Sequence, residues 1–187
     1  MSDGVSNEKV VYLMRALPCC GKSFTARQLA GESGVICETD EYFYTHVGDD
    51  PQKYDYKTEL LPLAQQWNFE RFQQAVQDGK APIVIDRGNS LNLESQRYAK
   101  FAVEHGYQVE LKEPDSPWWQ EIRVLLKYKR VTRTILHGWA KQLAKKSKSS
   151  HRVPESTIRH WMDNWKWDVT IEDILAYETP SSDGEEN

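Results

Sequence analysis

Residues Ala16 to Ser23 read ALPCCGKS, a spacing that in other chains binds the phosphates of a nucleotide. Such a loop consists of a small residue, four variable residues, glycine, lysine and serine. It binds phosphate when it follows a strand and opens a helix. Backbone N–H groups of such a loop, with the N-terminus of the helix, converge on phosphate oxygens. Lys22 is expected to reach the β- and γ-phosphates as a catalytic group, and Ser23 to ligate Mg²⁺. The expected nucleotide-binding residues are Ala16, Pro18, Cys19, Cys20, Gly21, Lys22, Ser23 and Phe24.

Two features of this loop differ from its usual composition. Ala16 stands where the pattern usually has glycine, which the backbone tolerates if φ stays negative. Cys19 and Cys20 are adjacent, and a disulfide between neighbours would be strained. Thiols beside Lys22 and a helix N-terminus can have lowered pKa values and react with oxidants. The interpretation that we favour is simpler: both cysteines are small side chains that fit the loop.

Two aspartates are expected at the same edge of a sheet as the loop. Asp40 follows the apolar run Val35–Thr39, and Asp86 ends the run Pro82–Asp86. Ligands of an open parallel sheet bind outside the carboxyl ends of the strands, so both carboxylates should face the loop. Asp40 can accept the proton of an attacking hydroxyl, with a helix cap as the alternative, and Asp86 can hold Mg²⁺. The polar residues that follow could contact substrate or phosphate, or serve as turn residues: Arg87 and Asn89.

The elements that must position these residues alternate between short apolar runs and longer amphipathic ones. Strands are predicted at Val10–Ala16, Val35–Thr39, Pro82–Asp86 and Gln108–Leu111. Helices are predicted at Lys22–Glu32, Thr58–Asp78, Leu93–His105, Trp118–Ser147 with a possible break at Gly138, and Pro154–Trp167. This alternation predicts an α/β fold with a mainly parallel sheet and flanking helices. A single domain is expected over residues 9–177, with flexible tails at 1–8 and 178–187.

The composition is that of a globular chain and excludes several other classes of protein. Of the 187 residues, 39% are hydrophobic and 28% are charged, which excludes collagen and a fully disordered polymer. No apolar run approaches the roughly 18 residues of a membrane span, and the first residues lack the layout of a secretory signal. Three cysteines give neither a disulfide framework nor zinc spacing. A reduced, soluble, cytoplasmic protein without a membrane partner is expected.

One segment carries a charge opposite to that of the chain. Between Arg123 and Arg152 there are ten lysines and arginines and no acidic residue, although the net charge of the chain is −4. Apolar residues recur there at helical spacing, which favours a helical basic lid over a disordered tail. The segment could clamp the phosphates of ATP, form a groove for single-stranded nucleic acid or another anionic acceptor, or be a solvated face. Three of its arginines are candidates for stabilising the transferring phosphate in the transition state: Arg130, Arg133 and Arg152.

In this order, the motifs resemble those of the P-loop kinase-like domain of ubiquitin-ligase-binding proteins, which is akin to polynucleotide 5′-hydroxyl kinases. The resemblance covers about residues 10–175. It rests on the phosphate loop with Ala26-Arg27-Gln28-Leu29, and on Thr39–Phe43, Trp67-Asn68, Ile83–Asp86 with Asn89, Glu113–Asp115 and His151–Pro154. The resemblance implies ATP, Mg²⁺, the strand order 2-3-1-4-5, and transfer of the γ-phosphate to a hydroxyl with Asp40 as the general base.

The chain departs from that family in three places. The residues between Asp86 and Asn89 differ from the usual ones. Lys148 stands where an arginine is usual, and Arg152 where glycine is usual. Extra residues lie between Pro117 and His151, within the lid, so the lid arginine cannot be assigned by position.

The sequence therefore predicts a nucleotide-kinase-like P-loop NTPase that uses ATP and Mg²⁺ as a phosphotransferase. The acceptor favoured by the resemblance is the 5′-hydroxyl of a polynucleotide. Two alternatives stay open: a small-molecule kinase, and a nucleotide-binding module that switches a partner and transfers nothing. The sequence does not indicate an oligomeric state.

Overall fold

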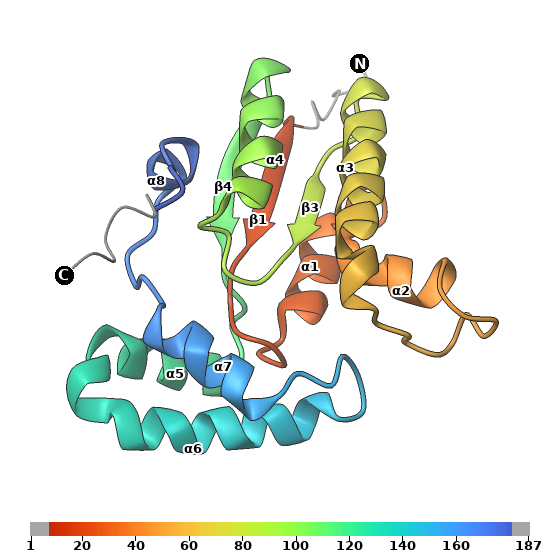
Figure 1. Ribbon diagram of the computed structural model, residues 1–187. Coiled ribbons are helices and arrows are strands. Elements are labelled where there is room, and N and C mark those ends of the chain that lie inside the picture. Colours follow the sequence, from red (N-terminus) through yellow and green to blue (C-terminus); the bar gives the residue numbers. More distant parts are fainter. Residues whose placement is uncertain (1–7, 181–187) are drawn as a thin grey trace.

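The sheet at the centre of the molecule is parallel and has four strands. The computed structural model, shown in Figure 1, describes residues 8–180, so most of both predicted tails lies outside the described residues. The strands are β1 (Val10–Met14), β2 (Val35–Glu38), β3 (Ile83–Asp86) and β4 (Gln108–Lys112). They lie in the order β2-β3-β1-β4, and each neighbouring pair is parallel. The predicted α/β fold is confirmed, and the four predicted strands differ from the observed ones at their ends.

The two central strands are apolar because both faces of the sheet are covered. All four residues of β3 are buried, and Val11, Leu13 and Met14 of β1 are almost inaccessible to solvent. Such a continuous apolar run is typical of a strand within a parallel sheet. The register pairs Glu38 with Asp86, so the last residues of β2 and β3 are neighbours at the carboxyl edge of the sheet.

Helices pack on both faces of this sheet. On one face, α1 (Lys22–Ala30) places Ala26 and Ala30 against Met14 and Val84. On the other face lie α3 (Leu61–Gln77) and α4 (Leu93–Glu104), side by side in Figure 1. Their buried rings pack with the strand residues of the larger core, and the amide of Asn68 donates to the hydroxyl of Tyr98 at 2.9 Å. Short turns precede α3: the 3₁₀ turn Thr39–Glu41, α2 (Tyr42–Thr45) and the 3₁₀ turn Thr58–Leu60.

A second layer of helices lies beyond the carboxyl edge of the strands, at the bottom of Figure 1. It consists of α5 (Pro117–Lys127), α6 (Lys129–Ser147) and α7 (Glu155–Asp163), which share a core around the buried Trp119. The predicted helical segment is confirmed, but its predicted break at Gly138 is wrong, because the break falls at Tyr128. Gly138 is exposed within α6, and one glycine costs a helix only about 1 kcal/mol. Buried Leu136, Ala140 and Leu143 keep the helix continuous on either side of it.

The resemblance implies a fifth strand, and this expectation is wrong for residues 8–180, where the sheet has four strands. After α7 the chain forms a helix, α8 (Ile171–Leu175), which packs against α4 and β4. Thr170 and Asp173 form a reciprocal capping box at its start, which favours a helix over a strand. The side-chain amide of Gln96 donates to three carbonyls at its other end, those of Ile174, Leu175 and Tyr177.

One buried cation ties the sheet to the layer of helices. Arg15 follows β1, is only 3% exposed, and lies over the ring of Trp165 at 3.9 Å from guanidinium carbon to ring centroid. Its guanidinium donates to the backbone oxygens of Asn89 and Lys166 and to the side-chain oxygen of Asn89. Trp165 in turn makes an edge contact with Trp119, with ring centroids 5.7 Å apart.

None of the helices in residues 8–180 is long and apolar enough to cross a membrane.

Candidate active site

A cavity of about 1310 Å³ lies between the carboxyl edge of the sheet and the layer of helices. The loop after β1 and the start of α1 form one wall, and the ends of β2 and β3 form another. The connection between α6 and α7 contributes residues 150–154 from the opposite side. Most of the candidate residues of the sequence line this cavity: Ala16, Pro18, Cys19, Gly21, Lys22, Ser23, Phe24, Asp40, Asp86 and Arg152.

The loop between β1 and α1 follows a strand and opens a helix, as its sequence predicts. Gly21 precedes α1 with φ of 92°, in the left-handed region that favours glycine. Cys19 also has positive φ, at 58°. The ammonium of Lys22 donates to the carbonyl oxygens of Ala16 and Leu17, at 3.2 and 3.0 Å. Lys22 therefore lies across the loop, with its ammonium bound to carbonyls at the start of the loop.

Two residues that the sequence analysis missed hold this loop from the layer of helices. The hydroxyl of Ser116 donates to the carbonyl of Cys20 at 2.7 Å, and it also caps α5 by accepting from the N–H of Trp119. The indole N–H of Trp118 donates to the carbonyl of Cys19 at 2.9 Å. The signal for Ser116 was the Ser-Pro pair, which is typical of the start of a helix. No signal in the sequence indicated the contact of Trp118.

The hydroxyl of Ser23 and the carboxylate of Asp86 lie together beside the loop. Ser23 donates to Oδ2 of Asp86 at 3.0 Å. Asp86 is buried, and burial raises the pKa of its carboxyl, whereas Lys22 and the hydrogen bond from Ser23 lower it. A hydroxyl and a buried carboxylate in contact are oxygen donors of the kind that Mg²⁺ prefers. These two residues therefore fit a magnesium site.

Asp40 lies on the same rim of the sheet as Asp86. The hydroxyl of Tyr54 donates to its Oδ1 at 2.9 Å, and Nδ1 of His151 lies 3.5 Å from its Oδ2. The ring of Tyr54 also contacts that of His151, with centroids 4.8 Å apart. The side chain of Asp40 makes none of the helix-capping hydrogen bonds described for the neighbouring turns in residues 38–46. Its carboxylate is 37% exposed and faces the cavity.

Glu38 adds a third carboxylate to this rim. Its Oε1 lies 4.0 Å from Nε2 of His151, and one ligand atom each from Glu38, Asp40 and His151 fall within 4.8 Å of one another. Burial, followed by the charges of Asp86, Asp40 and Glu41, raises the pKa of Glu38 to about 8. The rim therefore gathers acidic side chains beside Lys22, and their proximity favours the protonated form of Glu38.

The relationship of the chain to known proteins agrees with this loop and sheet. A family model described as an AAA domain matches residues 11–166. The chain belongs to this AAA-domain family. This chain is also 36% identical over 135 residues to human NEDD4-binding protein 2. The matched residues make up 71% of this chain and 7% of that protein, so the chain spans a small part of its relative. The two matches confirm the P-loop fold and the resemblance to a kinase-like P-loop family.

The basic residues of the AAA domain separate into two groups around the cavity. Arg152 lines it, and so does Lys146, whose ammonium lies 4.2 Å from the ring centroid of Trp118. Arg130 and Arg133 are on α6 and do not line the cavity; Arg133 lies 3.8 Å from Asp163. Among the arginines considered for the transferring phosphate, the geometry therefore favours Arg152.

Arg87 and Asn89 line the cavity but are engaged by other side chains. The guanidinium of Arg87 lies 3.5 Å from Glu94, also contacts the hydroxyl of Thr39, and is largely buried. Asn89 accepts the hydrogen bonds of Arg15 described above. Both residues therefore support the loop after β3, which matches the turn alternative better than a direct contact with substrate.

The adjacent cysteines of the AAA domain differ from each other. Both thiols are free. Cys20 is fully buried, and burial raises the pKa of its thiol to about 12. Because a thiolate is the reactive form, Cys20 has the character of an inert packing residue. The simpler interpretation, small side chains that fit the loop, therefore holds for Cys20.

We expect Glu38→Gln to stabilise the AAA domain at neutral and alkaline pH. The folded state holds a proton on Glu38 up to a pKa of about 8, against an ordinary value of 4.5. The folded state therefore binds more protons between these values, and the free energy of unfolding falls as pH rises through that window. The glutamine variant lacks this loss, so its advantage over the wild type should be small at pH 5 and larger at pH 8. Urea unfolding in EDTA at both values measures it.

The control for this experiment is Glu104→Gln, which removes an exposed carboxylate at the end of α4. Its effect on the free energy of unfolding should not grow with pH. A Glu38→Gln variant whose advantage is the same at pH 5 and pH 8 would show that Glu38 ionises normally in the folded state.

Proposed function

We propose that this AAA domain is an ATP- and Mg²⁺-dependent phosphotransferase that moves the γ-phosphate of ATP to a hydroxyl, with the 5′-hydroxyl of a polynucleotide as the acceptor. One observation carries the proposal: a phosphate loop, a magnesium-type pair and a partly exposed carboxylate line the same cavity. The loop supplies Lys22, the pair is Ser23 with Asp86, and the carboxylate is Asp40. Phosphoryl transfer needs little more than these parts, because its catalysis is mostly positioning and charge stabilisation.

Each residue has a definite task in this proposal. Lys22 and the backbone N–H groups of the loop bind the β- and γ-phosphates. Ser23 and Asp86 hold Mg²⁺, which when bound neutralises charge on phosphate oxygens. Asp40 accepts the proton of the acceptor hydroxyl while the oxygen of that hydroxyl bonds to the γ-phosphorus. The bond from that phosphorus to the bridging oxygen of ADP breaks. Arg152, from the opposite wall, is the cation best situated to stabilise the transferring group.

The contacts of Asp40 agree with the role of a proton acceptor. Tyr54 occupies one of its oxygens as a donor, and this fixes the carboxylate plane. The second oxygen faces His151 across 3.5 Å, a distance longer than a normal hydrogen bond. That oxygen therefore retains the capacity to take a hydrogen bond from an incoming hydroxyl.

A small-molecule acceptor is the second candidate, and one wall of the cavity favours it. Three tyrosine rings line the cavity beside Asp40: Tyr44, Tyr54 and Tyr56. Tyr54 and Tyr56 are nearly parallel, and Tyr56 is 45% exposed. Such a wall can pack against a single planar or apolar acceptor as well as against the terminal nucleoside of a strand.

The test is transfer of label from γ-labelled ATP, with 5′-hydroxyl oligonucleotides offered beside a panel of nucleosides, sugars and other small alcohols. We expect labelled oligonucleotide in the presence of Mg²⁺ and none in EDTA. Label on small alcohols alone would favour the second candidate. ATP binding without transfer to any acceptor would contradict a phosphotransferase and favour the switch module.

A further inference from the structure

The charges of the basic segment are compensated unevenly along α5 and α6. Near the start of the segment, Arg123 lies 3.1 Å from Glu113, and Arg133 pairs with Asp163. Lys129 donates to the carbonyls of Asp163 and Trp165, and Lys127 lies over the ring of Trp167 at 4.5 Å. Most of the cations in this half therefore have partners within the fold.

The half nearest the cavity is different. Lys141, Lys145 and Lys148 recur at intervals of four and three residues, the spacing of one helix face, along the end of α6 and its C-cap, and Arg152 lies in the turn that follows. We call these four residues the basic stripe. Each is exposed, and none has an ion-pair partner among residues 8–180. Glu155, the acid that lines the same cavity as these cations, is engaged by Arg159 at 2.6 Å.

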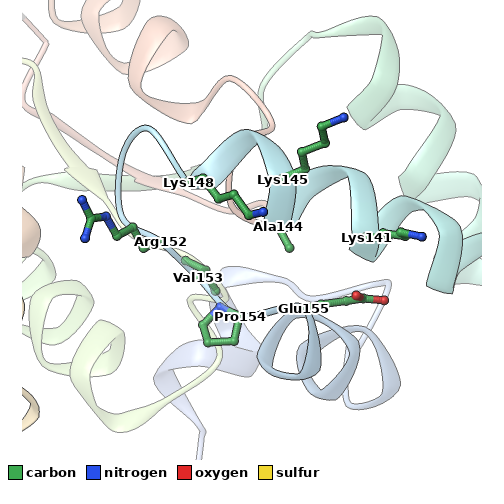
Figure 2. A pocket seen from close by; sticks show the side chains of 8 residues that line it. All are labelled: Lys141, Ala144, Lys145, Lys148, Arg152, Val153, Pro154 and Glu155. Atoms are coloured by element: carbon green, nitrogen blue, oxygen red, sulfur yellow. The ribbon is translucent and has the colours of Figure 1, made fainter.

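The basic stripe borders a second, smaller cavity, of about 610 Å³, between α6 and the start of α7. Figure 2 shows Lys141 and Lys145 on α6, Lys148 directly after it and Arg152 on the connection that follows, with Val153 and Pro154 beside it. Like charges at this spacing repel one another, which destabilises a helix by a few tenths of a kcal/mol for each pair. The fold keeps this arrangement without an internal anion, so an external anion is its natural partner.

The stripe connects to the candidate active site through its last member. Arg152, Val153 and Pro154 line both cavities. Arg152 has φ of 52°, and its N–H donates to the carbonyl of Ser147 at 2.8 Å. The fully buried hydroxyl of Ser147 accepts from the N–H of Val153 at 2.8 Å. This turn is therefore well defined, and it places Arg152 next in the chain to His151, which faces Asp40.

We propose that the basic stripe binds the phosphate backbone of a single-stranded nucleic acid whose terminal hydroxyl lies at Asp40. This inference rests on the proposed function and adds a binding site outside the reaction cavity. The lysines extend over seven residues, or about 10 Å of helix, beyond Arg152. ATP on the phosphate loop cannot also occupy that length, and a small acceptor cannot reach it. A chain with a charge at every repeat can follow the stripe from Arg152 to Lys141.

The apolar residues of the smaller cavity also suit a strand. Ala144, Val153 and Pro154 line the cavity together with the cations and offer an apolar surface that sugars or bases can contact. Contacts to phosphates position a strand without reading its sequence. We therefore expect the stripe to bind strands of different sequence about equally well.

The experiment compares 5′-hydroxyl oligothymidylates of two, four, six and eight nucleotides as acceptors at 0.1 M salt. For the wild type, KM should fall with length and then level off, whereas kcat should change little. The variant carries Lys141→Ala, Lys145→Ala and Lys148→Ala together. Its KM for the octamer should rise about 10- to 100-fold, and its KM for the dimer should stay near that of the wild type. The matched control is Lys53→Ala, Lys80→Ala and Lys100→Ala, which removes three exposed lysines away from both cavities.

Binding of a fluorescent twelve-nucleotide strand, followed by anisotropy across a salt series, gives a readout that does not need catalysis. Three lost phosphate contacts should reduce the slope of log affinity against log salt by about 2 in the triple variant. A slope and an affinity equal to those of the wild type would overturn the proposal. So would a KM that does not depend on acceptor length, or equal competition by polyglutamate.

The two proposals fail separately. Transfer to small alcohols with no binding of strands would overturn the basic stripe as a nucleic-acid site and leave the phosphotransferase standing. Salt-dependent binding of strands that the triple variant loses, without transfer to any acceptor, would support the stripe and contradict the phosphotransferase.

Discussion

Replacing Asp40 with asparagine should reduce phosphoryl transfer by about 10²- to 10⁴-fold while ATP affinity stays nearly unchanged. The substitution keeps the shape of the side chain and its acceptor contact with Tyr54, but it removes the group that takes the proton. A general base of this kind typically contributes a factor of that size. The measurement is the initial rate of label transfer at saturating ATP and acceptor, with ATP affinity determined by calorimetry.

Two further variants make this result specific. Asp49→Asn removes an exposed acid from the turn after α2 and should leave the rate unchanged. Tyr54→Phe keeps the carboxylate but removes its hydrogen-bond donor, so its loss should be smaller than that of Asp40→Asn. If Asp40→Asn retains a rate within a few-fold of the wild type, Asp40 is a structural acid and the base lies elsewhere.

The second large effect concerns nucleotide binding. Lys22→Ala should weaken ATP affinity about 10- to 150-fold, because a charge-assisted hydrogen bond contributes about 1.5–3 kcal/mol. The lysine contacts loop carbonyls at the surface of the cavity and belongs to none of the core clusters, so the fold should survive. Calorimetric titration with ATP and Mg²⁺ measures the affinity, and circular dichroism checks the fold.

The matched control is Lys80→Ala, an exposed lysine in the turn before β3. It should bind ATP as the wild type does. An unchanged ATP affinity in a folded Lys22→Ala variant would contradict the assignment of residues 16–23 as the nucleotide loop.

The parts of this molecule that local chemistry dictates could be predicted from the sequence. The phosphate loop is one, since the spacing of Gly21, Lys22 and Ser23 is set by backbone geometry within eight residues. The central strands are another, because burial on both faces requires the apolar runs of β1 and of β3, which ends at Asp86. The rule that ligands gather at the carboxyl ends of parallel strands then brings Asp40 and Asp86 to one rim without any knowledge of side-chain packing.

The features that were missed depend on contacts between distant segments. Ser116 and Trp118 hold the loop from about a hundred residues away, and Tyr54 reaches Asp40 from an irregular segment with no periodic pattern. The helix break was predicted at Gly138 instead of Tyr128. Glycine is a weak helix breaker when its neighbours are well packed. The resemblance implied a fifth strand, but the chain after α7 forms α8. The capping box of α8 is a local signal for a helix that the sequence analysis did not use.

The buried Arg15 has a consequence for how this molecule moves. Its contacts with Asn89, Lys166 and Trp165 fasten the α7 end of the helical layer to the sheet. The opposite end of that layer meets the sheet through the exposed turn that carries His151 and Arg152. Ser116 and Trp118 also hold the loop after β1, so the layer is fastened to the sheet side at several places and cannot rotate over the cavity as a rigid plate. Hydrogen exchange should then find the amides of α5 and α7 about as well protected as those of the strands.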